Sequence, residues 1–589
     1  MSDPSDGRDG IEPTGDRDEN GGEPAPGLDR RGFLRLGAAG GLAAAVPGVG
    51  AAVAGEGGER AADGSEDVHP YAPGGDPGRW DDFELAGAGV AELAEAMESG
   101  DRTAAEIAAR YMDRIRALDR RGPALRQVLE LNPDALSIAR RLDRERERGE
   151  SRGPLHGIPV ILKDNIDTGD RMDTSAGSLA LAGTSAPRDA FIVQRLREAG
   201  AVVLGKANLS EWANFRSTES SSGWSGRGGQ GRNPYALDRT PCGSSSGSAA
   251  AVAAEYAPLA IGTETDGSVT CPAAACSVVG VKPTLGLCSR SGIVPIAHSQ
   301  DTAGPMAKSV EDAAVLLGAL TGVDPRDPKT RESRGEVPSD YRRFLDPSGL
   351  QGARLGVARS DFFGYTEETD RVGEEALAAL EAAGAELVED VEIPHTGEYG
   401  DAEWTVLQYE FRADLDAYLE DRARRAGGLP VESLEDVIRF NEENRAREMP
   451  WFGQDILEMS AEKGSLESEE YREALERSKR LAGPEGIDAA LEEHDLDALV
   501  GMTTAPPWPI DLVNGDAGGG SATTPAAVAG YPHVTVPAGY VHGLPVGFSF
   551  VGTAWSEPDL LRFAHAFEVE RDARERPRFR TTESLLGES

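Results

Sequence analysis

Two serine-bearing turns that enclose one short helix and one short strand constrain this chain more than any other feature. Residues 240–283 read TPCGSSSGSAAAVAAEYAPLAIGTETDGSVTCPAAACSVVGVKP. Residues 243–247 form a serine-dense turn, and the alanine-rich segment 248–255 predicts a tightly packed helix. The apolar run 258–262 then predicts a buried strand, which ends in a second polar turn at 263–268.

The hydroxyl groups of these turns and one upstream lysine are candidates for chemistry. Ser244 lies in the first turn and Ser268 in the second, 24 residues later. Lys163 ends the apolar run 157–162, a position that predicts at least partial burial. Burial disfavours a charged ammonium and lowers the pKa of a lysine from its usual ~10.4. A lysine of this kind can act as a base.

Further motifs accompany these turns: LHGIPVILKDNI at 155–166, GAVVLGKANLSEW at 200–212, VGVKPT at 279–284, SQDTAGPM at 299–306 and GYPHVTVP at 530–537. Together with the two turns, they resemble the amidase signature family of hydrolases. The resemblance covers roughly residues 80–575. It looks closest to the peptide amidase branch, because the second turn reads GTETDGS and Pro241-Cys242 precedes the first.

The resemblance implies a Ser-cisSer-Lys triad. Ser268 matches the acylated nucleophile, Ser244 the bridging serine that follows a cis peptide bond to Gly243, and Lys163 the base. The backbone N–H groups that match the oxyanion hole and substrate-binding turn belong to Thr265, Asp266, Gly267 and Ser268. Asp266 departs from the commoner Gly-Gly-Ser form, but its N–H can still donate.

The alternation of apolar runs with helical segments from residue 157 onward is typical of α/β layering. Expected strands are 158–162, 201–204, 353–358, 497–500 and 533–537; expected helices are 103–117, 133–148, 190–199, 374–383 and 558–571, with a helix-rich region at 400–480. The resemblance implies a single large domain whose mixed, mostly buried central sheet is covered by helices on both faces.

Two other catalytic patterns compete with the triad. Residues 243–247 fit G-x-S-x-G, which would make Ser245 the nucleophile of an α/β-hydrolase, but no apolar strand precedes it. Ser460 and Lys463 fit S-x-x-K without the motifs that accompany it elsewhere. We expect His156 and His533 to be hydrogen-bonded structural groups.

Composition limits the partners. The chain has 589 residues and a net charge of −41, so a nucleic acid would be repelled. Only seven residues are lysine, and arginine supplies nearly all the positive charge. High acid content with few lysines resembles the surfaces of proteins from strongly saline surroundings, where salt screens self-repulsion. We therefore expect a halophilic protein; its oligomeric state cannot be read from the sequence.

The cysteines predict neither a metal site nor a cofactor. Cys242, Cys271, Cys276 and Cys288 show no paired C-x-x-C spacing and have no accompanying histidine motif. All four lie among small residues, where cysteine packs as a small hydrophobe. We expect core packing, with a disulfide as the main alternative.

An export signal precedes the region of resemblance. Residues 29–54 hold adjacent arginines, a weakly apolar run and a terminal Ala-Val-Ala, a pattern that looks like a twin-arginine signal peptide. The run is rich in Gly and Ala and no cysteine follows it, so no stable membrane anchor is expected. The expected segments are 1–28 disordered, 29–54 signal peptide, 55–79 flexible linker, 80–575 amidase domain and 576–589 flexible tail.

Three functions remain open. The first is an exported, metal-independent amide hydrolase acting on peptide C-terminal amides or similar small amides. The second is a component of an amidotransferase that supplies ammonia to a tRNA-bound substrate, which the export signal and the acidic charge disfavour. The third is a non-catalytic exported binding protein.

The export signal is tested by replacing both arginines, Arg30→Lys together with Arg31→Lys. The double variant should remain in the cytoplasm, because a twin-arginine signal is read through that pair. Fractionation followed by immunoblotting measures the distribution; secretion equal to that of the unaltered chain would contradict the prediction.

Salt dependence is tested by thermal unfolding at low and at molar salt. The melting temperature should rise with salt, because screening weakens repulsion among the surplus carboxylates. A melting temperature that does not change with salt refutes a halophilic surface.

Overall fold

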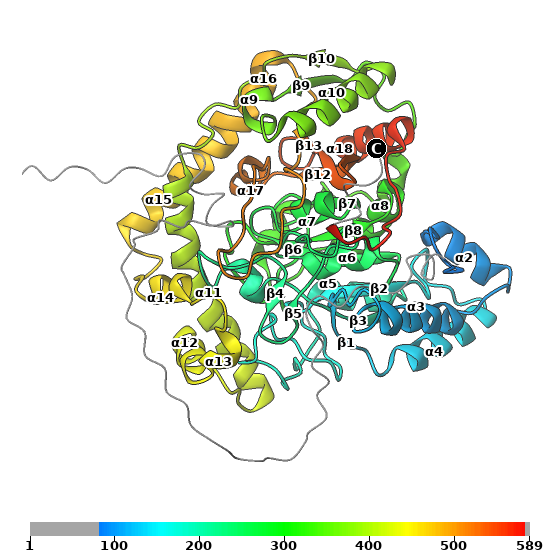
Figure 1. The fold of residues 1–589 in the computed structure, drawn as a ribbon, viewed down its shortest axis with the longest axis vertical. Coiled ribbons are helices and arrows are strands. Elements are labelled where there is room, and N and C mark those ends of the chain that lie inside the picture. Colours follow the sequence, from blue (N-terminus) through cyan, green and yellow to red (C-terminus); the bar gives the residue numbers. More distant parts are fainter. Residues whose placement is uncertain (1–81, 583–589) are drawn as a thin grey trace, which may run out of the picture.

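The computed structural model describes residues 82–582. The expected disordered segment, signal peptide and linker, and the end of the tail, lie outside the described residues. An eleven-stranded mixed sheet crosses the centre of the molecule in the order β1-β3-β2-β6-β8-β7-β12-β13-β11-β9-β10 (Figure 1). Helices flank this sheet, which confirms the predicted α/β fold.

The strands are short and most are buried. Their bounds are β1 (Val128–Leu131), β2 (Pro159–Lys163), β3 (Val202–Ala207), β6 (Leu259–Glu264), β7 (Val279–Lys282), β8 (Thr302–Ala307), β9 (Arg354–Val357), β10 (Glu386–Val388), β11 (Ala498–Met502), β12 (His533–Val541) and β13 (Leu544–Val551); β4 (Trp224–Ser225) and β5 (Gly229–Gln230) form a separate hairpin.

The parallel pairing of β2 and β6 brings Lys163 and the second serine-bearing turn to the same edge of the sheet. β2 pairs in parallel with both β3 and β6, and Leu162 lies opposite Ile261. Every residue of the three strands is buried, and each strand begins with a run of apolar residues instead of an alternating pattern. Because parallel strands end at the same edge, Lys163 at the end of β2 faces the turn that follows β6.

The helices form layers around the sheet and one distinct lobe. Their bounds are α2 (Val90–Glu98), α3 (Ala104–Leu118), α4 (Ala135–Glu147), α5 (Phe191–Glu198), α6 (Ser246–Ala253), α7 (Thr270–Ala275), α8 (Val310–Leu320), α9 (Arg359–Phe362), α10 (Glu367–Ala382), α11 (Gly400–Ala426), α12 (Leu434–Glu443), α13 (Arg445–Glu448), α14 (Asp455–Ala461), α15 (Glu469–Ala482), α16 (Asp488–His494), α17 (Thr524–Ala529) and α18 (Glu557–Arg571). In Figure 1 helices α9, α10 and α16 lie at the top of the molecule, and α2–α4 lie together at its lower right side.

The lobe of α11–α14 builds a wall beside the sheet. It packs around an apolar cluster in which Phe411 and Leu415 of α11 meet Trp212, Phe215 and Ile456. The ring of Phe215 lies 5.0 Å from that of Phe411 and 5.6 Å from that of Trp404. Aromatic side chains from the predicted helix-rich region 400–480 thus reach the edge where β2 and β6 end.

Most elements predicted from periodicity are present. The segment 248–255 is α6, 258–262 is β6, and the helix predicted at 103–117 is α3, which opens with a capping box between Thr103 and Glu106. The predictions omitted five strands of the central sheet, β1, β7, β8, β10 and β13, and several helices, α8 among them. The sequence of β8, TAGPMA, has a single β-branched residue, Thr302, and no aromatic one, so it carries little of the signal that usually indicates a strand.

The described part of the expected tail is held by the domain. Phe579 is buried and its N–H donates to the carbonyl of Pro234, while Arg580 forms a β-bridge with Ala236. These contacts continue the folded chain beyond residue 575.

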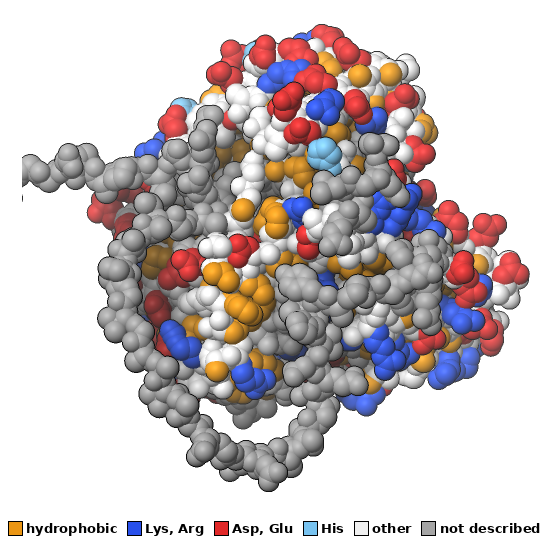
Figure 2. Space-filling model, viewed as in Figure 1, with side chains coloured by type: hydrophobic (Ala, Val, Ile, Leu, Met, Phe, Trp, Pro, Cys, Tyr) orange, Lys and Arg blue, Asp and Glu red, His pale blue; other side chains and the backbone are white. Residues whose placement is uncertain are grey.

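The visible surface carries many charges. In Figure 2 acidic side chains gather over the end formed by α9, α10 and α16, with basic side chains among them. Among residues 82–582 no helix combines the length and the apolar character needed to cross a membrane.

Candidate active site

Lys163 is the buried centre of the site. Its side chain ends β2 and is fully enclosed. Nζ lies 2.7 Å from Ser244 Oγ, 2.8 Å from Thr263 Oγ1 and 3.1 Å from the carbonyl oxygen of Thr263. Desolvation lowers the pKa of Lys163 to about 7, although the carboxylates of Asp301 and Glu264 oppose the shift. A substantial fraction of Lys163 is therefore unprotonated at neutral pH.

The first turn presents Ser244 to this lysine. The peptide bond between Gly243 and Ser244 is cis, as the resemblance implies, and α6 begins two residues later. Position 243 has room only for glycine, because a Cβ there would overlap the hydroxyl of Ser210. The N–H of Ser210 donates to the carbonyl of Ser244 at 3.1 Å, which fixes the turn against the chain that follows β3.

The second turn, between β6 and α7, is held by side-chain hydrogen bonds. Thr265 Oγ1 donates to Asp301 Oδ1 at 2.6 Å. The carboxylate of Asp266 accepts hydrogen bonds from Thr523 Oγ1 at 2.6 Å and Thr524 Oγ1 at 2.7 Å. The two side chains that precede Gly267, whose φ is +72°, thus anchor the turn without using its backbone N–H groups.

The two turns meet directly. The N–H of Ser245 donates to the carbonyl of Ser268 at 3.1 Å. Within the described residues nothing accepts a hydrogen bond from the backbone N–H of Asp266, Gly267 or Ser268. Free N–H groups on a fixed turn are the arrangement that can stabilise an oxyanion.

A cavity of about 170 Å³ opens onto both turns. Ser268, Gly267, Asp266 and Thr265 line it from the second turn and Gly243 from the first, whereas Lys163 and Ser244 do not line it. Its other walls are mostly apolar and include Phe215, Trp404, Leu407, Ile456 and Trp508. A ligand in this cavity reaches Ser268 first, with the lysine and second serine behind it.

A family model described as Amidase matches residues 106–561. The chain belongs to the amidase family.

Relatives of this amidase share most of its length. It is 52% identical to a peptide amidase from Stenotrophomonas maltophilia of known structure, with a TM-score of 0.81 and coverage of 85% of this chain and 100% of that one. It is 40% identical to a probable amidase of Arabidopsis thaliana over 84% of this chain and 92% of the relative. It is 35% identical to the A-type subunit of the glutamyl-tRNA(Gln) amidotransferase of Carboxydothermus hydrogenoformans, over 82% and 98% respectively.

These comparisons establish the reaction class. The family and the relatives named amidase support an amide-hydrolysing enzyme over a non-catalytic binding protein.

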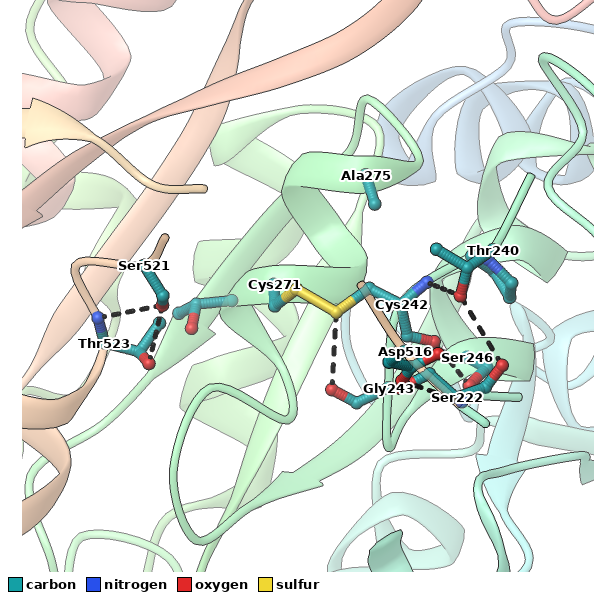
Figure 3. The surroundings of a disulfide bond; sticks show 12 residues. Ser222, Thr240, Cys242, Gly243, Ser246, Cys271, Ala275, Asp516, Ser521 and Thr523 are labelled. Carbon is teal, nitrogen blue, oxygen red and sulfur yellow. Dashed lines mark hydrogen bonds between the residues drawn. A yellow bond between two sulfur atoms is a disulfide. The ribbon is translucent and has the colours of Figure 1, made fainter. Parts of the chain in front are cut away.

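The cysteines of the amidase do not all pack as free thiols. Cys242 and Cys271 form a disulfide beside the two turns (Figure 3), so the expectation of core packing is wrong for this pair. Their separation of 29 residues gave no sign of their proximity. Cys276 and Cys288 are free and buried, as expected.

The competing catalytic patterns have structural roles. Ser245 Oγ is buried, donates to the carbonyl of Thr263 at 3.0 Å and accepts from its N–H at 3.1 Å. Ser460 Oγ donates to the carbonyl of Ile456 within α14. Neither hydroxyl lines the cavity of the amidase.

No histidine of residues 82–582 lines the cavity. His156 Nε2 lies 2.9 Å from the carbonyl of Leu142, and His533 Nε2 lies 2.7 Å from Ser549 Oγ, the structural hydrogen bonds expected of them. His298, Glu410 and Asp414 bring possible ligand atoms within 4.8 Å of one another. Both carboxylates already accept hydrogen bonds from backbone N–H groups, so this group is explained without an ion.

Two contributions were not predicted from the sequence. Thr263 supplies two of the three groups around Lys163 Nζ, and Asp301 links the lysine environment to the second turn. Both residues lie in segments that the sequence motifs include, but only the folded chain shows where their side chains point.

Proposed function

We propose that the amidase cleaves a carboxamide through an acyl-enzyme, with Ser268 as nucleophile, Ser244 as proton relay and Lys163 as base. This proposal depends mainly on one observation, the hydrogen bond of 2.7 Å between Lys163 Nζ and Ser244 Oγ, which is made by a lysine whose pKa is lowered to about 7. A serine hydroxyl is a weak nucleophile unless a base removes its proton, and a neutral amine can do so.

The hydrogen-bonding capacity of a neutral lysine matches its surroundings. An unprotonated amine has two N–H donors and one lone pair. Its two donors are satisfied by the carbonyl and hydroxyl oxygens of Thr263, which leaves the lone pair for the hydroxyl hydrogen of Ser244. Ser244 can then pass its proton to Lys163 while it accepts one from Ser268.

The reaction would proceed in two halves. Ser268 Oγ attacks the carbonyl carbon as its proton moves through Ser244 to Lys163. The oxyanion is stabilised by N–H groups of the second turn; removal of one such donor costs roughly 2.7–4 kcal/mol in a serine protease. The C–N bond then breaks as the proton returns through Ser244 to the leaving nitrogen, and ammonia or an amine departs. Water repeats the sequence on the ester and releases a carboxylic acid.

The substrate class that we propose is the C-terminal amide of a peptide or a similar small amide. Support comes from the 52% identity to a peptide amidase and from the cavity next to Ser268, whose walls are mainly apolar and aromatic. No metal or other cofactor enters this mechanism, since the base and the oxyanion donors are residues of the chain.

An A-type amidotransferase component is the alternative. Relatives with that name share about a third of their residues with this chain, fewer than the peptide amidase shares. The net charge of −41 also opposes contact with tRNA. We therefore place the amidotransferase second.

We propose that the protein acts outside the cytoplasm after twin-arginine export. The Cys242–Cys271 disulfide supports an oxidising location, because such bonds are rare in the reducing cytosol.

Substitution of the triad tests the mechanism. Ser268→Ala should lower kcat on a peptide amide by about 10⁴-fold or more, because the acyl-enzyme cannot form. Lys163→Ala should lower kcat by about 10²–10⁴-fold with little change in substrate binding, because only the proton acceptor is lost. Ammonia release measures turnover, and Ser460→Ala serves as a control outside the cavity. Near-normal turnover by the Ser268 variant would exclude it as nucleophile.

The pH profile tests the state of Lys163. Since only the neutral amine can accept a proton, kcat/KM should rise with pH and level off above about 7, the lowered pKa of this lysine. Asp301→Asn should move the rising limb to lower pH, because the carboxylate that favours the protonated lysine is then lost. A limb near the ordinary lysine pKa of ~10.4 would show that the amine is not desolvated in solution.

A further inference from the structure

The Cys242–Cys271 disulfide joins the two functional turns covalently. Cys242 directly precedes Gly243 and Ser244, and Cys271 is the second residue of α7, three residues after Ser268. Their Cα atoms lie 6.1 Å apart. In Figure 3 the disulfide lies between the segment that carries Gly243 and Ser246 and the segment that carries Ser521 and Thr523.

The two turns also share hydrogen bonds made by Ser245. Its N–H donates to the carbonyl of Ser268, and its Oγ donates to the carbonyl of Thr263 and accepts from the N–H of Thr263. The start of α7 is fixed to β6, because Glu264 Oε2 accepts from the N–H groups of Val269 at 2.7 Å and Thr270 at 2.9 Å. The second turn is thus anchored to the sheet, whereas the disulfide adds the covalent tie from α7 to the first turn.

The backbone of Cys242 is held in an uncommon conformation. Its φ is +58°, a region that non-glycine residues rarely adopt. Its N–H donates to Thr240 Oγ1 at 3.1 Å and its carbonyl accepts from Ser246 Oγ at 2.6 Å. The backbone on both sides of the cysteine is therefore held, and its side chain is directed to Cys271.

The disulfide also forms part of the cavity wall. Both cysteines line the cavity that contains Ser268. A small dithiol that enters the cavity can therefore reach the bond, and a ligand bound there should shield it.

We infer that the Cys242–Cys271 disulfide is a positioning element that sets the distance between the Ser244 and Ser268 hydroxyls, so that the amidase reaches full activity only when this bond is closed. The inference rests on the proposed roles of the two serines. Two thiols cannot approach as closely as two bonded sulfurs, so opening the bond lets the turns separate. A displacement of about 1 Å at reacting groups can cost about 10²-fold in rate.

The redox step is ordinary thiol–disulfide exchange. Dithiothreitol transfers two electrons and two protons to the bond, gives two cysteine thiols and becomes a cyclic disulfide. Oxidised glutathione reverses the change, taking up the two electrons and two protons as two glutathione thiols.

The test compares oxidised and reduced full-length enzyme on a peptide amide. Reduction, or Cys242→Ala with Cys271→Ala, should lower kcat by about 10–100-fold with less than about threefold change in KM, because the effect is on the transition state. Oxidised glutathione should restore the reduced enzyme but not the double variant. Cys288→Ala, a buried free cysteine that does not line the cavity, is the matched control and should keep the kcat of the unaltered enzyme.

A second measurement separates positioning from overall stability. A competitive inhibitor bound in the cavity should slow reduction of the bond, and circular dichroism should show the reduced enzyme still folded at the assay temperature. Unchanged kcat on reduction overturns the inference, and so does loss of activity together with loss of the folded signal. If instead the oxidised enzyme keeps its activity after Ser268→Ala, the proposed function itself fails.

Discussion

The burial of one lysine amine is the constraint on which the site depends. Placing an ammonium inside a protein is costly unless it is paired or loses its proton. Around Lys163 the polar atoms within hydrogen-bonding distance belong to Ser244 and Thr263, and no carboxylate of the described residues is hydrogen-bonded to Nζ. Asp301 and Glu264 act only through space, so desolvation prevails and lowers the pKa. The parallel pairing of β2 with β6 produces this environment, because it sets the end of one strand against the turn after the other.

The strands and the helix around Lys163 could be predicted from the sequence better than the contacts between them. β2 and β6 begin with apolar runs and α6 is a block of small residues, so local composition was sufficient to predict them. β8 has no such signal, because Gly, Pro and Ala are weak strand formers and only the pairing of this segment with β6 and β7 in the folded chain makes it a strand. Lys163, Ser244 and Ser268 were identified through the resemblance, and the structure brings the first two into contact and joins the third through the backbone of Ser245.

The contacts that could not be predicted all depend on chain segments that meet only in the folded state. Asp266 lies two residues before Ser268, but its partners Thr523 and Thr524 lie more than 250 residues away. The disulfide partners likewise become neighbours only because α6 and β6 return the chain to its starting point. The cavity walls come from α11, α14 and the segment that carries Trp508, which explains why the chemistry is readable from local motifs whereas the choice of substrate is not.

The scarcity of lysine has a structural counterpart. Five of the seven lysines donate to backbone carbonyls: Lys163, Lys206, Lys282, Lys308 and Lys479. Lys206 and Lys282 are as fully buried as Lys163. Arginine supplies most of the remaining positive charge, and its guanidinium stays protonated at any relevant pH. A side chain that must give up its proton inside the protein cannot be arginine. At position 163 the proposed mechanism needs a compact amine that can lose its charge, and the chain supplies a lysine there.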